Sequence, residues 1–165
     1  MIRLLRARNL ALLVLSLMPL AGCSESGGTD PFVPIEFSSE DAEMNAAIAK
    51  ARSTLPSFWK AFEAGVADES GYALKVRITD QHGTEHLWLT NIERSGGETT
   101  GLVDNEPTIV KAVKRDDRIV IPDADISDWM YMRSGKIVGN ETMKPMLKRL
   151  PKEKADQLRG LMAEP

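Results

Sequence analysis

Hydrophobic and polar residues alternate along the middle of the chain. Over residues 72–79 every second residue is apolar or aromatic, which is the period of a half-buried strand. A turn at residues 80–83 leads to a second strand at 85–93, and further apolar pieces predict short strands at 102–103, 118–121, 126–132 and 137–138. Tight turns between successive strands predict an antiparallel meander of five or six strands. An apolar piece at 109–113 fits neither a strand nor a helix clearly.

The segment before these strands has the three- and four-residue spacing of an amphipathic helix. Ser38 and Asp41 have capping-box spacing at its start, and apolar side chains then recur as far as Phe62. Pro56 lacks a backbone amide, which predicts a break or kink with a second short helix opening there, and Gly65 is suited to end it. We therefore predict an α+β fold, with an N-terminal helix packed on a curved antiparallel sheet.

Residues 142–162 are predicted to form a C-terminal helical tail that Pro145 and Pro151 interrupt. Its basic residues are Lys144, Lys148, Arg149, Lys152, Lys154 and Arg159. This cluster indicates either a solvated helix face or a contact with anionic lipid head groups or an acidic partner.

The N-terminal segment is typical of an export signal. Three arginines precede an apolar run at 10–20, about half of the roughly 20 residues that a membrane-spanning helix needs. The run ends in Leu20-Ala21-Gly22-Cys23, which resembles the lipobox of bacterial lipoproteins, where the preceding peptide is removed and the cysteine is acylated. An uncleaved interfacial anchor or a plain secretory signal is the alternative.

This resemblance divides the chain into four parts. We expect a signal peptide at 1–22, a lipidated Cys23 with a flexible tether at 23–38, one α+β domain at 39–143 and the basic tail at 144–165. The lipid would hold the protein at the extracytoplasmic side of the cell envelope. Ser24 after the cysteine favours the periplasmic face of the outer membrane if the organism has two membranes.

Removal of the leader makes the protein more acidic. Lys plus Arg falls from 21 to 18 while Asp plus Glu stays at 24, which leaves a net charge of −6. A net acidic domain does not attract nucleic acid through its overall field. Cys23 is the only cysteine, so the chain forms no intramolecular disulfide.

Several short motifs occur in one order between residues 41 and 143. They are Ala46-x-Ile48-Ala49-x-Ala51-Arg52-x-Thr54-Leu55-Pro56-x-Phe58, Leu74-Lys75-Val76, Gly83-x-Glu85-His86-x-Trp88, Asp125-Ile126-Ser127-Asp128-Trp129-x-Tyr131 and Gly135-Lys136-x-x-Gly139-Asn140-x-Thr142. Together they resemble an uncharacterised bacterial family known as YegJ-like, which carries no established activity, cofactor or catalytic residue. Asp116 stands where the family would have a glycine. Because Asp tolerates positive φ better than most residues, the turn is expected to survive with some strain.

No motif identifies a reaction, a metal or a cofactor. His82, Glu85 and His86 have the letters of the H-x-x-E-H zinc-protease motif, but the strand pattern places the two histidines in a turn and a strand instead of on one helix face. The acidic segment at 123–128 lacks the glycine and glutamate of a calcium loop. We therefore expect no metal site and no cofactor.

Aromatic and polar residues on two strands are the best candidates for a binding groove. His86 and Trp88 share one face of their strand, and Trp129 and Tyr131 share a face of a later strand. In a strongly curved sheet these rings would line one groove, with His86 and Asp128 near its rim. The alternative is that the rings close one end of a small core, with their polar tips hydrogen-bonded.

Two functions fit this pattern. One is a non-enzymatic binding or interaction module of the cell envelope, which contacts the membrane through Cys23 and an envelope protein, a peptide or a glycan through the groove. The other is a small envelope hydrolase that uses Glu85, His86 and Asp128.

Overall fold

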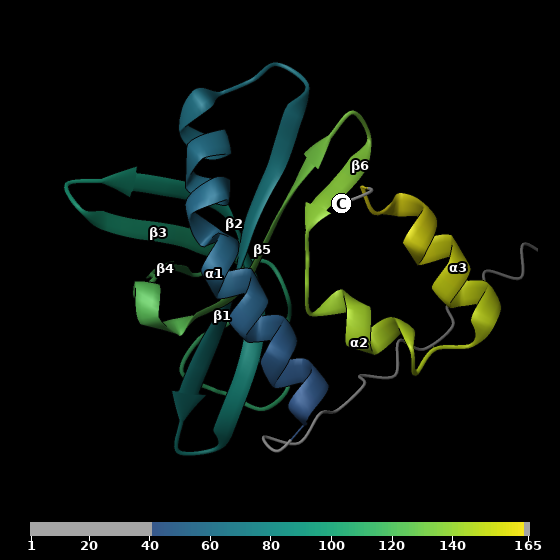
Figure 1. Ribbon diagram of the computed structural model, residues 1–165. Coiled ribbons are helices and arrows are strands. Elements are labelled where there is room, and N and C mark those ends of the chain that lie inside the picture. The colour runs from purple at the N-terminus through teal and green to yellow at the C-terminus, as the bar shows by residue number, and fades with distance from the viewer. Residues whose placement is uncertain (1–40, 164–165) are drawn as a thin grey trace, which may run out of the picture. The chain divides into compact units, whose positions relative to one another are not determined.

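A six-stranded antiparallel sheet is the centre of the computed structural model, which describes residues 41–163 (Figure 1). Its strands are β1 (Glu69–Asp80), β2 (Gly83–Ser95), β3 (Glu98–Val103), β4 (Arg118–Val120), β5 (Ile126–Arg133) and β6 (Lys136–Gly139). Their order across the sheet is β4-β3-β2-β1-β5-β6. The predicted α+β class is confirmed, with a helix packed on the sheet and short helices at the C-terminal end.

The first four strands form the predicted meander, but β5 does not continue it. After β4 the chain passes through a short 3₁₀ helix, η1 (Asp123–Asp125), and β5 pairs with the free edge of β1. The prediction of a simple meander is therefore wrong for β5. With a strand on each side, β1 has hydrogen-bonding partners for its backbone at both edges, which suits a strand whose Leu74 is completely buried.

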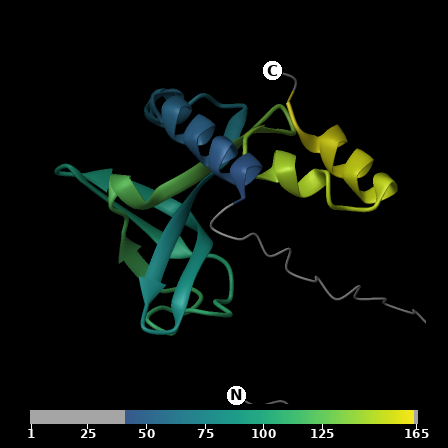
Figure 2. The ribbon, with the colours of Figure 1, turned by 60° about the horizontal axis from the view of Figure 1, so that its bottom comes forward.

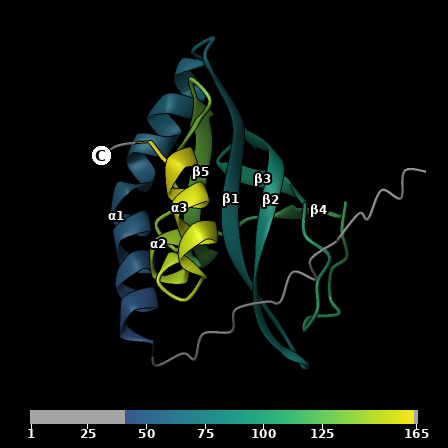
Figure 3. The same cartoon turned by 90° about the vertical axis from the view of Figure 1, so that its right-hand side faces the viewer.

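One helix, α1 (Ala42–Ala64), covers one face of the sheet, and Figure 3 shows it beside β5 and β1. Asp41 is its N-cap, and one carboxylate oxygen accepts a hydrogen bond from the Met44 amide at 2.8 Å. Gly65 ends the helix in the left-handed conformation, as predicted. Ser38, the other half of the expected capping box, lies outside the described residues.

The core lies between α1 and the sheet. Phe58 is fully buried, and its ring lies 4.9 Å from the ring of Trp59 and 5.8 Å from that of Trp129, centroid to centroid. The Trp129 indole donates a hydrogen bond to the Ala51 carbonyl at 2.9 Å. The expected second helix at Pro56 is wrong, because α1 continues through this residue. Packing of the apolar face offsets a helix-interior proline cost of about 3 kcal/mol.

Two short helices, α2 (Met143–Leu147) and α3 (Lys152–Leu161), follow β6, and Figure 2 shows them together beyond the end of α1. Pro151 separates them, as predicted. The predicted interruption at Pro145 is wrong, because this residue lies in the first turn of α2, where a proline needs no hydrogen-bonded amide. Leu147 and Ala155 are buried. After α3, Met162 forms a parallel bridge with Ile137 of β6.

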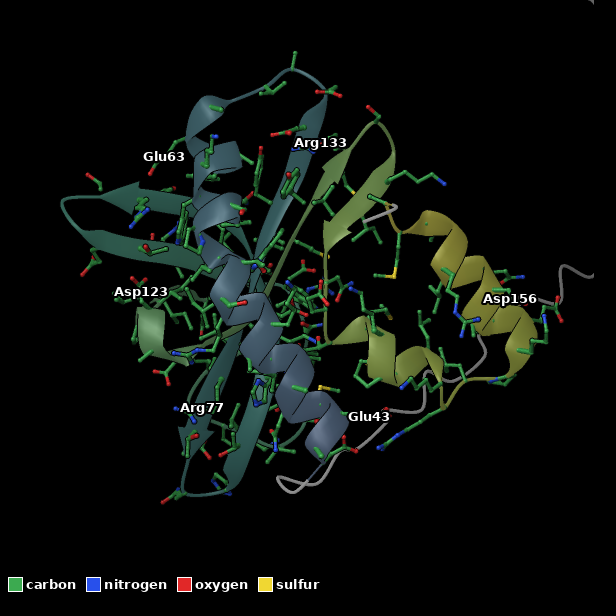
Figure 4. The ribbon with its side chains drawn as sticks, in the orientation of Figure 1. Glu43, Glu63, Arg77, Asp123, Arg133 and Asp156 are labelled. Carbon is green, nitrogen blue, oxygen red and sulfur yellow. The ribbon has the colours of Figure 1, made fainter. Side chains whose placement is uncertain are left out.

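Most of the positive charge of the tail is balanced by nearby acids. Five of its six basic residues form ion pairs, namely Lys144 with Glu141, Lys148 with Glu43, Arg149 with Asp41, and Lys152 and Arg159 with Asp156. The Met44 amide lowers the pKa of Asp41 against the effect of burial, and Arg149 lowers it further. Two of these pairs join the tail to the beginning of α1, where Figure 4 labels Glu43.

Candidate functional site

The sheet face opposite α1 carries a polar cluster that three strands assemble. Lys75 of β1 pairs with Trp88 of β2 on one side and with Asp128 of β5 on the other, and residues paired across strands share a face. Arg77 pairs with His86 in the next position along this face. We call this surface the open face and define it by Lys75, Arg77, His86, Trp88, Ser127 and Asp128.

A β-bulge brings Ser127 to the open face. The register shifts by one residue in β5, so that Lys75 pairs with Asp128 while Val76 pairs with Ile126. Ser127 is the additional residue, and its hydroxyl oxygen lies 2.8 Å from Nδ1 of His86. In a regular strand Ser127 would share a face with Trp129. The bulge instead separates the two residues, since Trp129 lies in the core.

Hydrogen bonding fixes the tautomer of His86. The Ser127 hydroxyl donates its single proton to the Lys75 carbonyl at 3.1 Å, because a carbonyl can only accept. The hydroxyl oxygen must then accept the Nδ1 proton of His86. Desolvation lowers the pKa of His86, and the charges of Lys75 and Arg77 lower it further. At neutral pH the exposed ring is thus uncharged, with Nε2 a hydrogen-bond acceptor that has no partner among residues 41–163.

Lys75 and Asp128 anchor the chain that follows β6. Asp128 is completely buried, and its carboxylate accepts hydrogen bonds from the amides of Trp129, Glu141 and Thr142 and from the Thr142 hydroxyl at 2.6 Å. Lys75 Nζ donates to the same hydroxyl at 2.8 Å. Burial raises the pKa of Asp128, although the Thr142 hydrogen bonds and Lys75 oppose the rise. These bonds leave Asp128 little capacity for a second role.

The charged end of Lys75 also lies over an aromatic ring. Its Nζ atom is 4.8 Å from the centre of the half-buried Trp88 ring, a cation–π contact. Burial lowers the pKa of Lys75, and the charge of Asp128 partly offsets this effect. The Trp88 side chain is thus held in place beside the exposed His86.

Glu85 lies on the opposite face of β2 from His86 and has a structural contact of its own. Its carboxylate accepts hydrogen bonds from the amides of Thr108, Ile109 and Val110 and from the Thr108 hydroxyl. Burial would raise the pKa of Glu85, but these hydrogen bonds outweigh it and lower the pKa. Glu85, His86 and Asp128 therefore do not converge on one site.

The five residues of the predicted groove divide between the two faces of the sheet. His86, Trp88 and Asp128 lie on the open face, whereas Trp129 and Tyr131 are only 5% and 4% exposed and belong to the core under α1. For these two rings the structure matches the alternative of a core closed by aromatic residues. The Tyr131 hydroxyl accepts a hydrogen bond from Arg133, and the Trp129 indole donates to Ala51.

The other acidic and histidine candidates lie apart from one another. His82 is exposed in the β1–β2 turn, and Asp125 forms an ion pair with Arg77 at 2.9 Å. Among residues 41–163 no group of three or more His, Cys, Asp or Glu side chains is arranged to hold a metal ion.

Lys75, Arg77 and Thr142 were not predicted as site residues. The period-two pattern places Lys75 on the solvent side of a regular strand, and Thr142 begins the predicted tail. A signal for Lys75 and Thr142 was nevertheless present, because both lie in the motifs that carry the family resemblance. Most of the open face therefore comes from three of those motifs, brought together by strand pairing.

Cys23 and the predicted tether lie outside the described residues. Within residues 41–163 no helix has the length and apolar character needed to cross a membrane.

These features define a class of α+β domain with one open antiparallel sheet, one helix packed on it and a polar cluster on the face opposite that helix. The chain belongs to the bacterial family described as "Uncharacterized protein conserved in bacteria (DUF2314)", which matches residues 41–161. This match includes all of α2 and α3.

The chain is also similar to two bacterial proteins. The chain is 38% identical over 149 residues to the uncharacterized protein YegJ of Escherichia coli K12, covering 90% of this chain and 95% of YegJ. It is 27% identical over 121 residues to a putative ankyrin repeat protein of Neisseria meningitidis serogroup B, covering 68% of this chain but 48% of that protein. No solved structure matches the chain.

Proposed function

We propose that the protein is a lipid-anchored binding module of the bacterial cell envelope, and that the open face around His86 and Trp88 contacts its partner. One observation carries the choice of surface: His86 presents an uncharged, unpartnered Nε2 atom beside a fixed Trp88 ring, within the part of the chain that the structure describes. A fixed aromatic surface beside hydrogen-bonding groups suits a peptide or a glycan.

Binding is favoured over hydrolysis by the roles of the acidic residues. A hydrolase needs a general base or nucleophile within hydrogen-bonding reach of its substrate and of its partner residues. Asp128 is buried under four hydrogen bonds, and Glu85 faces the loop at 108–110 on the other side of the sheet. His86 is thus left without an acid to form a catalytic pair.

The anchor is supported by the lipobox-like end of the leader and by the cluster of acidic residues in the tether. The predicted tether at 23–38 contains three acids and no base, which suits a solvated spacer between a lipid and a folded domain. Acylation provides about 0.8 kcal/mol for each buried methylene, so several acyl chains would make release from the membrane negligible.

Photo-crosslinking in the native host tests the contact surface, and intact-mass measurement tests the anchor. A benzophenone amino acid replaces the exposed Thr84, which lies two residues from His86 on the same face. Benzophenone reacts with C–H bonds of peptides and glycans alike. We expect one dominant adduct, at least tenfold weaker in His86→Ala and in Trp88→Ala, and unchanged in Lys154→Ala on the remote tail. Intact mass should show a mature chain that begins at acylated Cys23.

Four outcomes would contradict the proposal. An adduct that persists in both His86→Ala and Trp88→Ala would remove the open face as the contact surface. A full-length unmodified chain in the native host, or a Cys23→Ser variant that stays in the membrane fraction, would remove the anchor. Turnover of an envelope substrate that His86→Ala abolishes would favour the hydrolase.

A further inference from the structure

A groove of about 590 Å³ lies between the β5–β6 hairpin and the C-terminal end of α3. Its polar lining includes Arg133, Ser134, Lys136 and Arg159, and Val138 and Met162 contribute apolar surface. The volume is within the range of about 300–1,000 Å³ that small-molecule sites occupy. Figure 4 labels Arg133 and Arg77 at opposite ends of the sheet, so this groove is separate from the open face.

The charged side chains that line the groove are all positive. Arg133 and Arg159 each have a side chain 51% exposed, so each guanidinium keeps one side open to solvent. Two hydrogen bonds fix the Arg133 guanidinium: Nε donates to the nearly buried Glu69 at 2.7 Å, and a terminal nitrogen donates to the Tyr131 hydroxyl. A guanidinium has five N–H donors, and these contacts leave others for a ligand.

Lys136 offsets one of the features that oppose an anion here, the others being Glu69 and Asp156, which pair with the two arginines. The C-terminal end of a helix carries a partial negative charge, and α3 ends at the groove. Lys136 Nζ donates a hydrogen bond to the Gly160 carbonyl in that last turn. The ammonium group thereby neutralises the helix end and adds a third positive charge to the lining.

We propose that this groove binds a phosphate group carried on a small organic molecule. A guanidinium group can hold two phosphate oxygens in bidentate hydrogen bonds, and Arg133 and Arg159 both line the groove. Val138 and Met162 offer apolar contact for the carbon part of the ligand, and the groove is larger than phosphate alone requires. The same chemistry occurs in a phospholipid head group and in a soluble phosphate ester. The inference does not depend on the proposed anchor.

Calorimetric titration of the full chain, purified in a non-ionic detergent, tests the inference with two probes. Inorganic phosphate represents the free anion, and glycerophosphoglycerol represents the deacylated head group of an anionic phospholipid. We expect saturable binding that weakens at least tenfold in Arg159→Gln and in Lys136→Gln. The exposed Arg159–Asp156 pair contributes little to stability, so Arg159→Gln should keep the wild-type melting temperature.

Lys154→Gln is the matched control, because it removes one positive charge from the same helix at a residue outside the groove lining. Amide chemical shifts should change at Ser134 and Gly160 upon binding. Tighter binding of glycerophosphoglycerol than of inorganic phosphate would support the proposal, and equal affinity for the two probes would overturn it, because the carbon part would then contribute nothing. No binding at millimolar probe, or an equal loss of binding in Lys154→Gln, would overturn it.

Discussion

Gly139 leaves room for the ring of Trp129 at the point where β6 ends. A methyl group at this position would lie 2.5 Å from the indole ring and from the Trp129 carbonyl. The backbone φ of Gly139 is +83°, a conformation that side chains rarely adopt. Trp129 in turn joins the sheet to α1 through its hydrogen bond to Ala51. Gly139 therefore protects a contact on which the position of the helix depends.

Gly139→Ala should lower the free energy of unfolding by about 2–4 kcal/mol, from backbone strain of about 1 kcal/mol and overpacking of about 1–3 kcal/mol. Gly97→Ala is the control, because its φ is +84° and nothing lies within 4 Å of the added methyl group. It should lose only the backbone part. Urea denaturation of both variants separates the two effects, and equal losses would show that the clash with Trp129 is relaxed at no cost.

At single residues, the sequence predicts some backbone conformations but not the hydrogen bonds that depend on strand register. Asp116 adopts φ of +68°, as expected for a residue at a glycine position of a turn. Asp128, expected near the rim of a groove, is instead buried and accepts the Trp129 amide. The tautomer of His86 could not be predicted, because it depends on a bulge that moves Ser127 to the other face. A period-two pattern assumes that no strand contains an additional residue.

At the scale of elements, two carboxylates of the β1–β2 hairpin hold the loop between β3 and β4. Glu85 accepts the amides of residues 108–110, and Asp80 accepts those of Lys111 and Ala112 at 2.6 and 2.9 Å. These hydrogen bonds replace the regular structure that the apolar piece at 109–113 lacks. They also position the fully buried Val110 in the core. The loop is thus ordered by side chains that are distant in sequence.

Glu85→Gln should loosen this loop without unfolding the sheet, because it replaces one acceptor oxygen by an NH₂ group that faces backbone donors. Hydrogen bonds to a charged group contribute about 1.5–3 kcal/mol. We therefore expect trypsin to cleave at Lys111, Lys114 and Arg115 at least tenfold faster, as measured by mass spectrometry at pH 8. Glu98→Gln is the control, since this exposed acid lies at the start of β3. Cleavage at the wild-type rate in Glu85→Gln would show that the loop is held by Val110 instead.

The sequence predicts the types of the elements, but not the order of the strands in the sheet or the continuity of α1 through Pro56. Period-two patterning located β1 and β2, and short apolar pieces located β3 to β6. The choice of β1 as the neighbour of β5 depends on which sheet edge is free, and local pattern does not encode it. Pro56 locally favours a helix boundary, but the tertiary packing of Phe58 and Trp59 keeps α1 continuous through it.

At the scale of the whole molecule, the tail contributes to the folded domain. Its buried Leu147 and Ala155, its ion pairs to the start of α1, and the bridge from Met162 to Ile137 connect it to elements more than a hundred residues earlier and to the sheet. The family match extends to residue 161, beyond the end of α2. A basic helical segment was visible in the sequence, but its pairing with acids of α1 required the fold.

Leu147→Ala tests whether the tail and the sheet unfold together. The Leu147 side chain is 4% exposed, so removing its methyl groups should lower the free energy of unfolding by about 2–5 kcal/mol. In a cooperative domain, tryptophan fluorescence from the core and far-UV circular dichroism would shift to the same lower midpoint. Leu161→Ala, at a leucine 49% exposed in the same tail, should change stability by less than about 0.5 kcal/mol. If the tail folds separately, Leu147→Ala will leave the midpoint measured by tryptophan fluorescence at its wild-type value. Only the far-UV circular dichroism signal of the helices will then decline.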